Sequence, residues 1–270
     1  MPNLFPSLGI CLAVSVASPA LAQVTTNNAL PIGDGQALIR VQAIYLRAAE
    51  GDRFLEEVSF PVVFGYGATR NLALFAVAPL VNRQFTAAGS TDQDFGVSDL
   101  EIFARYTVFQ SNRPGQTLRI APLVGLEIPL SDLGSRSVDP SVGLVVTRQT
   151  LKDSLSASLT YQVNTEGAGV ELGDEVNFDL SYKYRVFPQL AAGFLFVGLE
   201  SNVISQGPAR VTGEPDLDVG GTRWFLSPSL QYIARKFVLE GAVQIPVVQN
   251  VGSEALATDI RLILGGQVNF

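Results

Sequence analysis

The 270-residue sequence contains no histidine, one cysteine, one methionine and one tryptophan. Serine nucleophiles generally need an imidazole as general base, and metal sites rely largely on histidine or cysteine. A catalytic Ser–Lys pair is the remaining alternative, because Ser181 and Lys183 would share a strand face. Such same-face neighbours are, however, common by chance. We therefore expect no enzyme, no metal and no cofactor. The sequence also lacks a phosphate-binding loop, and its net charge of −7 argues against a nucleic-acid partner.

Charged residues are scarce as well, at 16 % of the sequence against roughly 25 % in soluble domains, whereas 47 % of the residues are hydrophobic. Yet from residue 23 onward no apolar run reaches the roughly 18 residues that a spanning helix needs. An apolar chain without such a helix can satisfy its backbone in lipid only as a closed barrel. The alternative that stays open is a soluble β-sandwich.

The first residues are typical of a targeting segment. Residues 8–22 form an apolar stretch that ends in small residues, which predicts a signal peptide over residues 1–22 and cleavage before Gln23. A buried N-terminal helix is the alternative. Because Cys11 lies in this segment, the mature chain would have no disulfide.

Apolar and polar residues alternate along most of the remaining chain, with a period of two that indicates strands. Twelve such segments of about 10–14 residues fit a tilted crossing of a bilayer. The predicted strands are 37–48, 55–66, 72–85, 95–109, 117–130, 139–149, 154–164, 174–187, 191–201, 222–232, 237–248 and 259–270. We predict an all-β fold: a transmembrane antiparallel up-and-down β-barrel of about 12 strands over residues 37–270, preceded by a periplasmic segment over residues 23–36.

The predicted connections differ in length on the two sides of the barrel. Short turns at 67–71, 110–116, 150–153, 187–189 and 234–236 alternate with mostly longer loops, and in outer-membrane barrels the short side is periplasmic. An aromatic girdle is expected on that side. Its predicted members are Tyr66, Tyr106, Tyr184, Tyr232, Phe237 and Phe270. We expect the protein in the bacterial outer membrane with both termini in the periplasm.

The face opposite the apolar rows is predicted to line the lumen, and it carries charges of both signs. The candidate lumen residues are Arg40, Asp99, Glu101, Arg105, Arg119, Glu127, Asp179, Lys183, Arg185, Glu200, Arg223, Glu240, Asp259 and Arg261. Glu200 and Arg223 are expected to pair. The outer loops are rich in Asp and Glu. These residues could attract cations to the mouth of the barrel or bind divalent cations beside lipopolysaccharide, and the alternative is that they are simply solvated.

The chain ends within an alternating segment, at Phe270. This predicts a last strand that pairs with the first and leaves no free edge. A C-terminal aromatic residue also resembles the signal that barrel-assembly machinery recognises.

Three stretches carry a family resemblance: "FGYGATRNLALFAVAPLVNR" (64–83), "GVSDLEIFARY" (96–106) and "PLVGLEIPLSD" (122–132). They resemble the outer-membrane transporter-like family named for the meta-cleavage pathway of phenol degradation. The resemblance implies a barrel and uptake of hydrophobic or aromatic compounds, and it implies no ligand residues.

These observations predict an outer-membrane channel or uptake protein that passes small solutes, hydrophobic or aromatic ones included, through a narrow polar lumen. The alternative is a non-conducting structural or adhesin-like barrel, because strand number alone does not decide whether a barrel of this size is open. The expected partners are outer-membrane lipid, lipopolysaccharide, the barrel-assembly machinery and a small-molecule solute of unknown identity.

Overall fold

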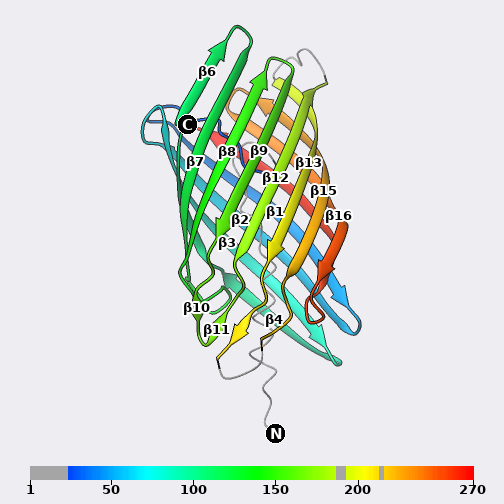
Figure 1. The fold of residues 1–270 in the computed structure, drawn as a ribbon. Coiled ribbons are helices and arrows are strands. Elements are labelled where there is room, and N and C mark those ends of the chain that lie inside the picture. Colours follow the sequence, from blue (N-terminus) through cyan, green and yellow to red (C-terminus); the bar gives the residue numbers. More distant parts are fainter. Residues whose placement is uncertain (1–23, 187–192, 213–215) are drawn as a thin grey trace.

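The structure is a computed structural model that describes residues 24–186, 193–212 and 216–270. The predicted signal peptide and the short turn predicted at 187–189 therefore lie outside the described residues. Within the described residues, no helix is long and apolar enough to cross a membrane. Nearly all of the regular structure is antiparallel β-sheet, drawn as a tilted barrel in Figure 1.

Twelve strands form the wall, as the alternation predicted. They are β1 (Ala37–Glu50), β2 (Arg53–Gly67), β3 (Leu72–Ala87), a fourth strand made of three parts, β7 (Gln116–Ile128), β8 (Asp139–Thr150), β9 (Asp153–Gln162), β12 (Glu175–Arg185), β13 (Gly193–Gln206), β15 (Gly221–Ala234), β16 (Phe237–Val251) and β17 (Ala257–Asn269). Three short strands, β10 (Glu166–Gly167), β11 (Val170–Glu171) and β14 (Arg210–Val211), form a small separate sheet in the loops.

The fourth wall strand is interrupted, whereas its sequence pattern predicted one continuous strand over 95–109. It consists of β4 (Ser90–Val97), β5 (Leu100–Tyr106) and β6 (Phe109–Arg113). β5 joins β3 to β7, while β4 extends the hairpin with β3 and β6 extends the hairpin with β7. Ser98 and Asp99 lie in the interruption between β4 and β5, beside the cavity described below.

The barrel closes between the first and last strands, as predicted. β1 pairs with β17 from Leu38 opposite Asn269 to Ala49 opposite Ala257. Beyond the strand, the Phe270 N–H donates to the Ala37 carbonyl at 2.9 Å, and the Ala37 N–H donates back at 3.4 Å. The seam therefore continues to the last residue and leaves no unpaired sheet edge there.

The two faces of the wall follow the predicted alternation. In β12, Leu180 and Tyr182 are more than 40 % exposed on the outside, while Ser181 between them is fully buried inside. An outward apolar surface and an inward polar surface are what a barrel in lipid requires.

The short turns that the structure describes and the C-terminus lie at one end of the barrel, which is the upper end in Figure 1, where β6 lies. β4, β10 and β11 lie at the opposite end (Figure 1). The rings of Tyr232 and Phe237 are 6.0 Å apart near the C-terminal end, and Phe270 is 68 % exposed. We call these the C-terminal end and the loop end of the barrel.

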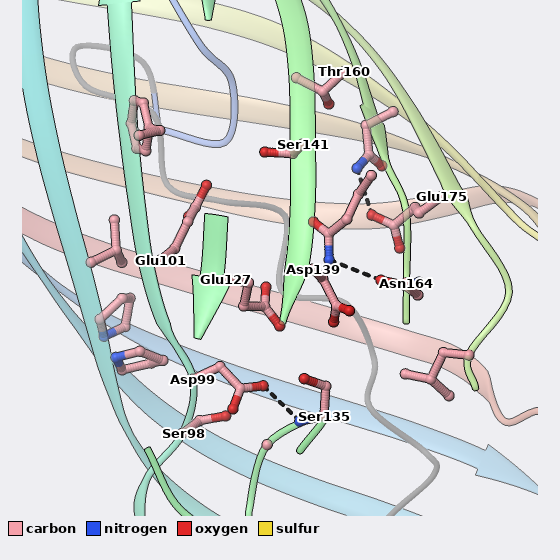
Figure 2. Close-up of a pocket in the computed structure, with 18 of the residues that line it drawn as sticks. Ser98, Asp99, Glu101, Glu127, Ser135, Asp139, Ser141, Thr160, Asn164 and Glu175 are labelled. Atoms are coloured by element: carbon pink, nitrogen blue, oxygen red, sulfur yellow. Dashed lines mark hydrogen bonds between the residues drawn. The ribbon is translucent and has the colours of Figure 1, made fainter. Parts of the chain in front are cut away.

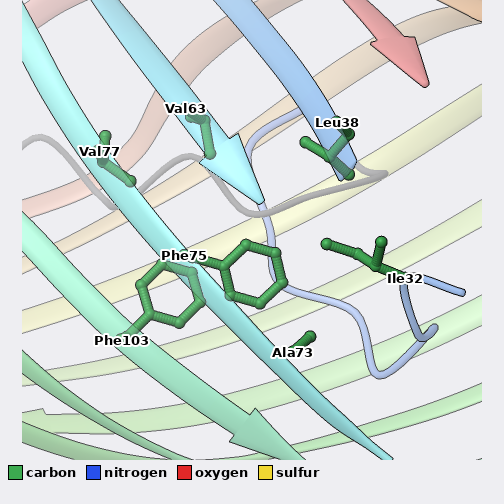
Figure 3. Packing of buried hydrophobic residues seen from close by; sticks show 7 residues of the cluster. All are labelled: Ile32, Leu38, Val63, Ala73, Phe75, Val77 and Phe103. Carbon is green, nitrogen blue, oxygen red and sulfur yellow. The ribbon is translucent and has the colours of Figure 1, made fainter. Parts of the chain in front are cut away.

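An apolar cluster lies inside the C-terminal half of the barrel. Ile32 packs there with Leu38, Val63, Ala73, Phe75, Val77 and Phe103 (Figure 3). The rings of Phe75 and Phe103 stack with centroids 4.6 Å apart, and the guanidinium carbon of Arg105 lies 5.0 Å from the centre of the Phe75 ring. Ile32 precedes β1, so this cluster holds the preceding segment against the inner wall.

Candidate functional site: the lumen and its N-terminal segment

Residues 24–32, which we call the N-terminal segment, lie inside the barrel. Residues 24–29 are all buried, and Val24 and Ala29 are at most 1 % exposed. The sequence predicted a periplasmic segment over residues 23–36, whereas residues 24–32 lie in the lumen. The structure differs because the segment's backbone and side chains find partners on the polar inner wall, which period-two reasoning about the wall does not reveal.

A tight turn at the C-terminal end directs the segment into the lumen. The Gly35 N–H donates to the Gly67 carbonyl at 2.8 Å, and Gly35 has a φ of 71°, which glycine adopts without strain. A Cβ on Gly67 would lie 2.1 Å from the Gly33 oxygen, so this close approach requires glycine.

Glu200 of β13 is the main acceptor for the start of the N-terminal segment. Its carboxylate accepts the N–H of Val24 at 3.1 Å, and both the N–H and the hydroxyl of Thr25 at 2.7 Å. Asn202, two residues along the same strand, bonds the Thr25 hydroxyl at 3.0 Å and carbonyl at 3.2 Å. Glu200 is fully buried, and these charge-assisted bonds satisfy its carboxylate.

A charged network on β1 and β16 holds Val24 from another side. Arg40 forms a salt bridge with Glu240 at 2.5 Å, with both side chains almost completely buried. The Gln42 amide donates to Glu240 at 2.9 Å and to the Val24 carbonyl at 3.1 Å. A buried pair needs such additional hydrogen bonds to offset its desolvation cost.

The later part of the N-terminal segment is bound by β5 and β8. The Arg105 guanidinium donates to the carbonyls of Asn28 and Leu30, the latter at 2.6 Å. The Ala29 N–H donates to the Thr147 hydroxyl at 2.8 Å, and Ala29 packs against Ala121, Leu123 and Val145. Through Glu200, Arg40, Arg105 and Thr147, hydrogen bonds bind the segment to four separate strands across the lumen.

A cavity of about 160 Å³ lies on the loop side of this segment, with Asn27 in its lining. Figure 2 shows acidic and polar side chains around it, among them Asp99, Glu101, Glu127 and Asp139. Val77, Phe103 and Leu123 contribute an apolar surface to the same cavity. The cavity can therefore receive a small solute with both a polar and an apolar part.

The structure places most of the candidate lumen residues inside the barrel. Arg40, Arg105, Asp179, Lys183, Glu200, Glu240 and Arg261 are buried and hydrogen-bonded there. Asp99, Glu101 and Glu127 line the loop-side cavity. Arg119, Arg185 and Arg223 are half-buried, and Arg185 lies over the ring of Phe194.

Two sequence expectations are corrected. Asp259 is not in the lumen: the pairing of β1 with β17 shifts between Arg47 and Ala48, and this bulge turns Asp259 outward to an exposed salt bridge with Arg47 at 3.3 Å. Glu200 does not pair with Arg223, because Glu200 lies opposite Ser227 and Arg223 opposite Ile204. The predicted inward face was correct for Glu200 and Arg223. The residue opposite Glu200 is Ser227, however, which lies four residues beyond Arg223 on β15.

Sequence reasoning missed the contribution of Asn202, Thr147 and Gln231. The predicted strand stopped at residue 201, whereas β13 continues to Gln206 and so carries Asn202 on the inner face beside Glu200. Thr147 and Gln231 are uncharged, and the predicted lumen residues were all charged. The alternation along their strands nevertheless indicates that both side chains face inward. Among the described residues, no group of three or more His, Cys, Asp or Glu could hold a metal ion.

The closed ring of twelve antiparallel strands, with apolar residues outside and polar residues inside, defines a β-barrel of the outer-membrane type. Residues 42–245 match the family model described as "Putative MetA-pathway of phenol degradation", and the chain belongs to this family. No curated protein sequence matches it.

Solved structures share the fold. The COG4313 outer membrane channel from Pseudomonas putida F1 has 16 % sequence identity and a TM-score of 0.71, and the match covers 90 % of this chain and 97 % of that one. The beta domain of the Bordetella autotransporter BrkA has 9 % identity and a TM-score of 0.50, covering 88 % and 100 %.

Replacing Glu200 with alanine should loosen the N-terminal segment. The change leaves the N–H groups of Val24 and Thr25 without their acceptor, which should cost about 1–3 kcal/mol at this site. Hydrogen exchange followed by mass spectrometry should show faster exchange in peptides covering residues 24–30, with little change in strands far from them.

Glu166→Ala provides the matched control, because Glu166 is exposed in the loop sheet and does not contact the N-terminal segment. Unchanged exchange at residues 24–30 in Glu200→Ala, or equal acceleration in the control, would show that Glu200 does not anchor the segment.

Proposed function

We propose that the protein is a narrow outer-membrane channel or uptake protein for small solutes, and that the N-terminal segment controls passage through it. The observation that carries this proposal is the way the segment is held. Its polar contacts are hydrogen bonds with Glu200, Asn202, Gln42, Arg105 and Thr147, in a lumen whose polar groups water could equally serve. Its apolar contacts are those of Val24, Ala29 and Ile32. The polar contacts can be exchanged for water, so the segment can leave at moderate cost.

A second candidate function is a non-conducting structural barrel. It is favoured by the number of strands that hold the segment and by the buried Arg40–Glu240 salt bridge behind it. In that case the segment would be a permanent part of the core. The two functions differ in whether ions ever pass through the purified protein.

The orientation belongs to the same proposal. The short turns and the C-terminus would face the periplasm, and the loop end with its acidic residues would face outward. The N-terminal segment would then enter the barrel from the periplasmic side, and solutes would reach the loop-side cavity first. Contact with lipopolysaccharide at the loop end is part of this orientation.

Family membership does not identify the solute. A small solute that is hydrophobic or aromatic agrees with the apolar surface formed by Val77, Phe103 and Leu123, while the carboxylates beside it add a preference for positive charge. Catalysis is not part of the proposal.

In planar bilayers, we expect the purified protein to give discrete current steps whose reversal potential in a potassium chloride gradient indicates cation preference. The acidic cavity should concentrate cations over a Debye length of about 10 Å at 0.1 M salt, so the preference should increase as salt is lowered. Asp139→Asn should reduce it, because the Asp139 carboxylate lines the cavity.

Glu50→Gln is the matched control, since Glu50 is exposed at the end of β1 and does not line the cavity. Repeated absence of steps at all salt concentrations would favour the structural barrel. Steps with an anion preference that Asp139→Asn leaves unchanged would contradict the role of the acidic cavity.

Phe270 is proposed as the assembly signal recognised by the barrel-assembly machinery. Its ring is 68 % exposed, while its backbone closes the seam with Ala37. Phe270→Ala keeps those backbone bonds and removes a ring that contributes about 1–3 kcal/mol at most when buried in lipid. We therefore expect less folded protein in cell outer membranes but nearly normal heat-modifiable gel migration after refolding in detergent.

Phe237→Ala is the control, because Phe237 is also an outward aromatic residue near the C-terminal end but begins a strand instead of ending the chain. Equal cellular yields of Phe270→Ala and the unmodified protein would refute the targeting role. Failure to refold in detergent would show that Phe270 acts mainly through packing.

A further inference from the structure

The connection between β7 and β8 folds inward at the loop-side cavity. It comprises residues 129–138, which we call the β7–β8 loop. Leu133, Gly134 and Ser135 in the middle of this loop line the cavity, and Gly134 is buried. The loop therefore forms part of the cavity wall instead of extending freely into solvent.

This loop bounds the cavity on the side of the loop end. Asp139 directly follows the loop on β8, whereas Gly143, the partner of Thr160, lies four residues further into the barrel. Figure 2 shows Ser135 and Asp99 facing each other on one side of the cavity and Thr160 on the opposite side. A solute that enters from the loop end therefore meets the β7–β8 loop before it reaches Thr160.

Two hydrogen bonds attach the loop to the interrupted fourth strand. The Ser135 N–H donates to the Asp99 carboxylate at 2.6 Å, and the Ser131 hydroxyl donates to the Val97 carbonyl at 2.5 Å. Asp99 lies between β4 and β5, and Val97 is the last residue of β4. The interruption of the fourth strand therefore provides the groups that hold the loop across the cavity.

The contact between Gly134 and Asp99 is too close for any larger residue. A Cβ on Gly134 would lie 1.6 Å from Oδ1 of Asp99 and 2.1 Å from its Cγ. Asp99 has little freedom to withdraw, because it is only 9 % exposed and its side chain is hydrogen-bonded to Glu127 on β7. The attached position of the loop thus requires glycine at residue 134.

The other side of the loop is held by buried groups. The Asp139 carboxylate accepts the Ser137 hydroxyl at 2.8 Å and the Thr165 N–H at 2.7 Å. The Arg136 backbone packs against β10, where a Cβ on Gly167 would lie 2.5 Å from the Arg136 carbonyl carbon. Arg136 has a φ of 60°, which is uncommon for a residue other than glycine.

The two attachments therefore differ in how easily they release. On the side of the fourth strand, water can replace both hydrogen bonds as the loop moves away. On the side of β8, Ser137 and Asp139 are 6 % and 1 % exposed, so separation there would leave buried polar groups without partners. Movement of the loop should thus break its bonds to Asp99 and Val97 and pivot about residues 136–138.

We propose that the β7–β8 loop is a lid on the loop-side cavity and that Asp99 is its latch. In the closed position seen here, the lid bounds the cavity towards the loop end, and the N-terminal segment bounds it on the opposite side. A solute would then pass two barriers in series, the lid first and the segment second. The inference rests on the proposed channel function and adds a second point of control to the same path.

Reaction of a cysteine inside the cavity measures the opening of the lid. In a Cys11→Ser background, Thr160→Cys places a thiol in the cavity, and Ser90→Cys places one at an exposed turn for comparison. The refolded full-length proteins are treated in detergent with iodoacetamide, a small neutral reagent, and the modification is followed by mass spectrometry. With the lid unchanged, we expect the thiol at residue 160 to react at least about tenfold more slowly than the thiol at residue 90.

Two variants release the latch in different ways. Gly134→Ala introduces a methyl group that cannot coexist with the Asp99 carboxylate, and Asp99→Ala removes the acceptor of the Ser135 N–H. Each should accelerate modification at residue 160 by about tenfold or more, as expected for the loss of a charge-assisted hydrogen bond. The double variant should react no faster than the faster single variant, because both changes act on one latch.

Gly266→Ala is the matched control, because a Cβ there would lie at an ordinary contact distance of 3.7 Å from Leu239 in the wall. It should leave the rate at residue 160 unchanged. Heat-modifiable gel migration verifies that every variant is folded, and the rate at residue 90 should be the same in all of them.

Equal rates at residues 160 and 90 with the lid unchanged would overturn the inference. So would unchanged rates in folded Gly134→Ala and Asp99→Ala proteins, or accelerations that multiply in the double variant. The labelling needs no conductance. A protein that gives current steps while its latch variants label at the original rate keeps the channel function and loses the lid, whereas latch-dependent labelling without current steps does the reverse.

Discussion

The structure depends on one constraint: in lipid, every backbone N–H and C=O of the wall must find a partner within the protein. Pairing of β1 with β17, extended by the reciprocal bonds between Ala37 and Phe270, completes the ring and removes the last free edge. Closure then forces alternate side chains inward, and in this ring of twelve strands they leave room for the N-terminal segment and for the loop-side cavity. The polar interior and the need to occupy it both follow from that closure.

The N-terminal segment meets this need. It supplies backbone N–H and C=O groups that complement Glu200, Arg105, Gln42 and Thr147, so that buried charges on the wall are satisfied by the chain itself. At the loop-side cavity beyond the segment, Oδ1 of Asn27 is buried without a hydrogen-bond partner. The lumen thus has a region filled by the segment and a hollow region that can receive a solute. This division is the physical basis for assigning control of passage to one region and binding to the other.

Much of the fold was predictable because the wall has a simple period. Outward residues such as Leu180 and Tyr182 must be apolar and inward residues polar, so strand number, closure and family resemblance could all be read from the sequence. The site was less predictable because it depends on position along the strands. A single bulge turned Asp259 outward, the extension of β13 brought Asn202 beside Glu200, and the segment before β1 carries no alternation that would indicate its place in the lumen. Contacts between distant segments of this kind depend on register, which alternation alone does not determine.

The central claim is that displacement of the N-terminal segment opens the lumen. A reversible disulfide tests it most directly, because the Ala29 N–H lies 2.8 Å from the Thr147 hydroxyl and the two backbones are therefore close. In a Cys11→Ser background, the Ala29→Cys/Thr147→Cys protein should give no current steps in planar bilayers when oxidised and should regain them on reduction, while each single variant should conduct under both conditions. Equal conductance of the oxidised and reduced double variant, with the disulfide verified by mass spectrometry, would contradict the account.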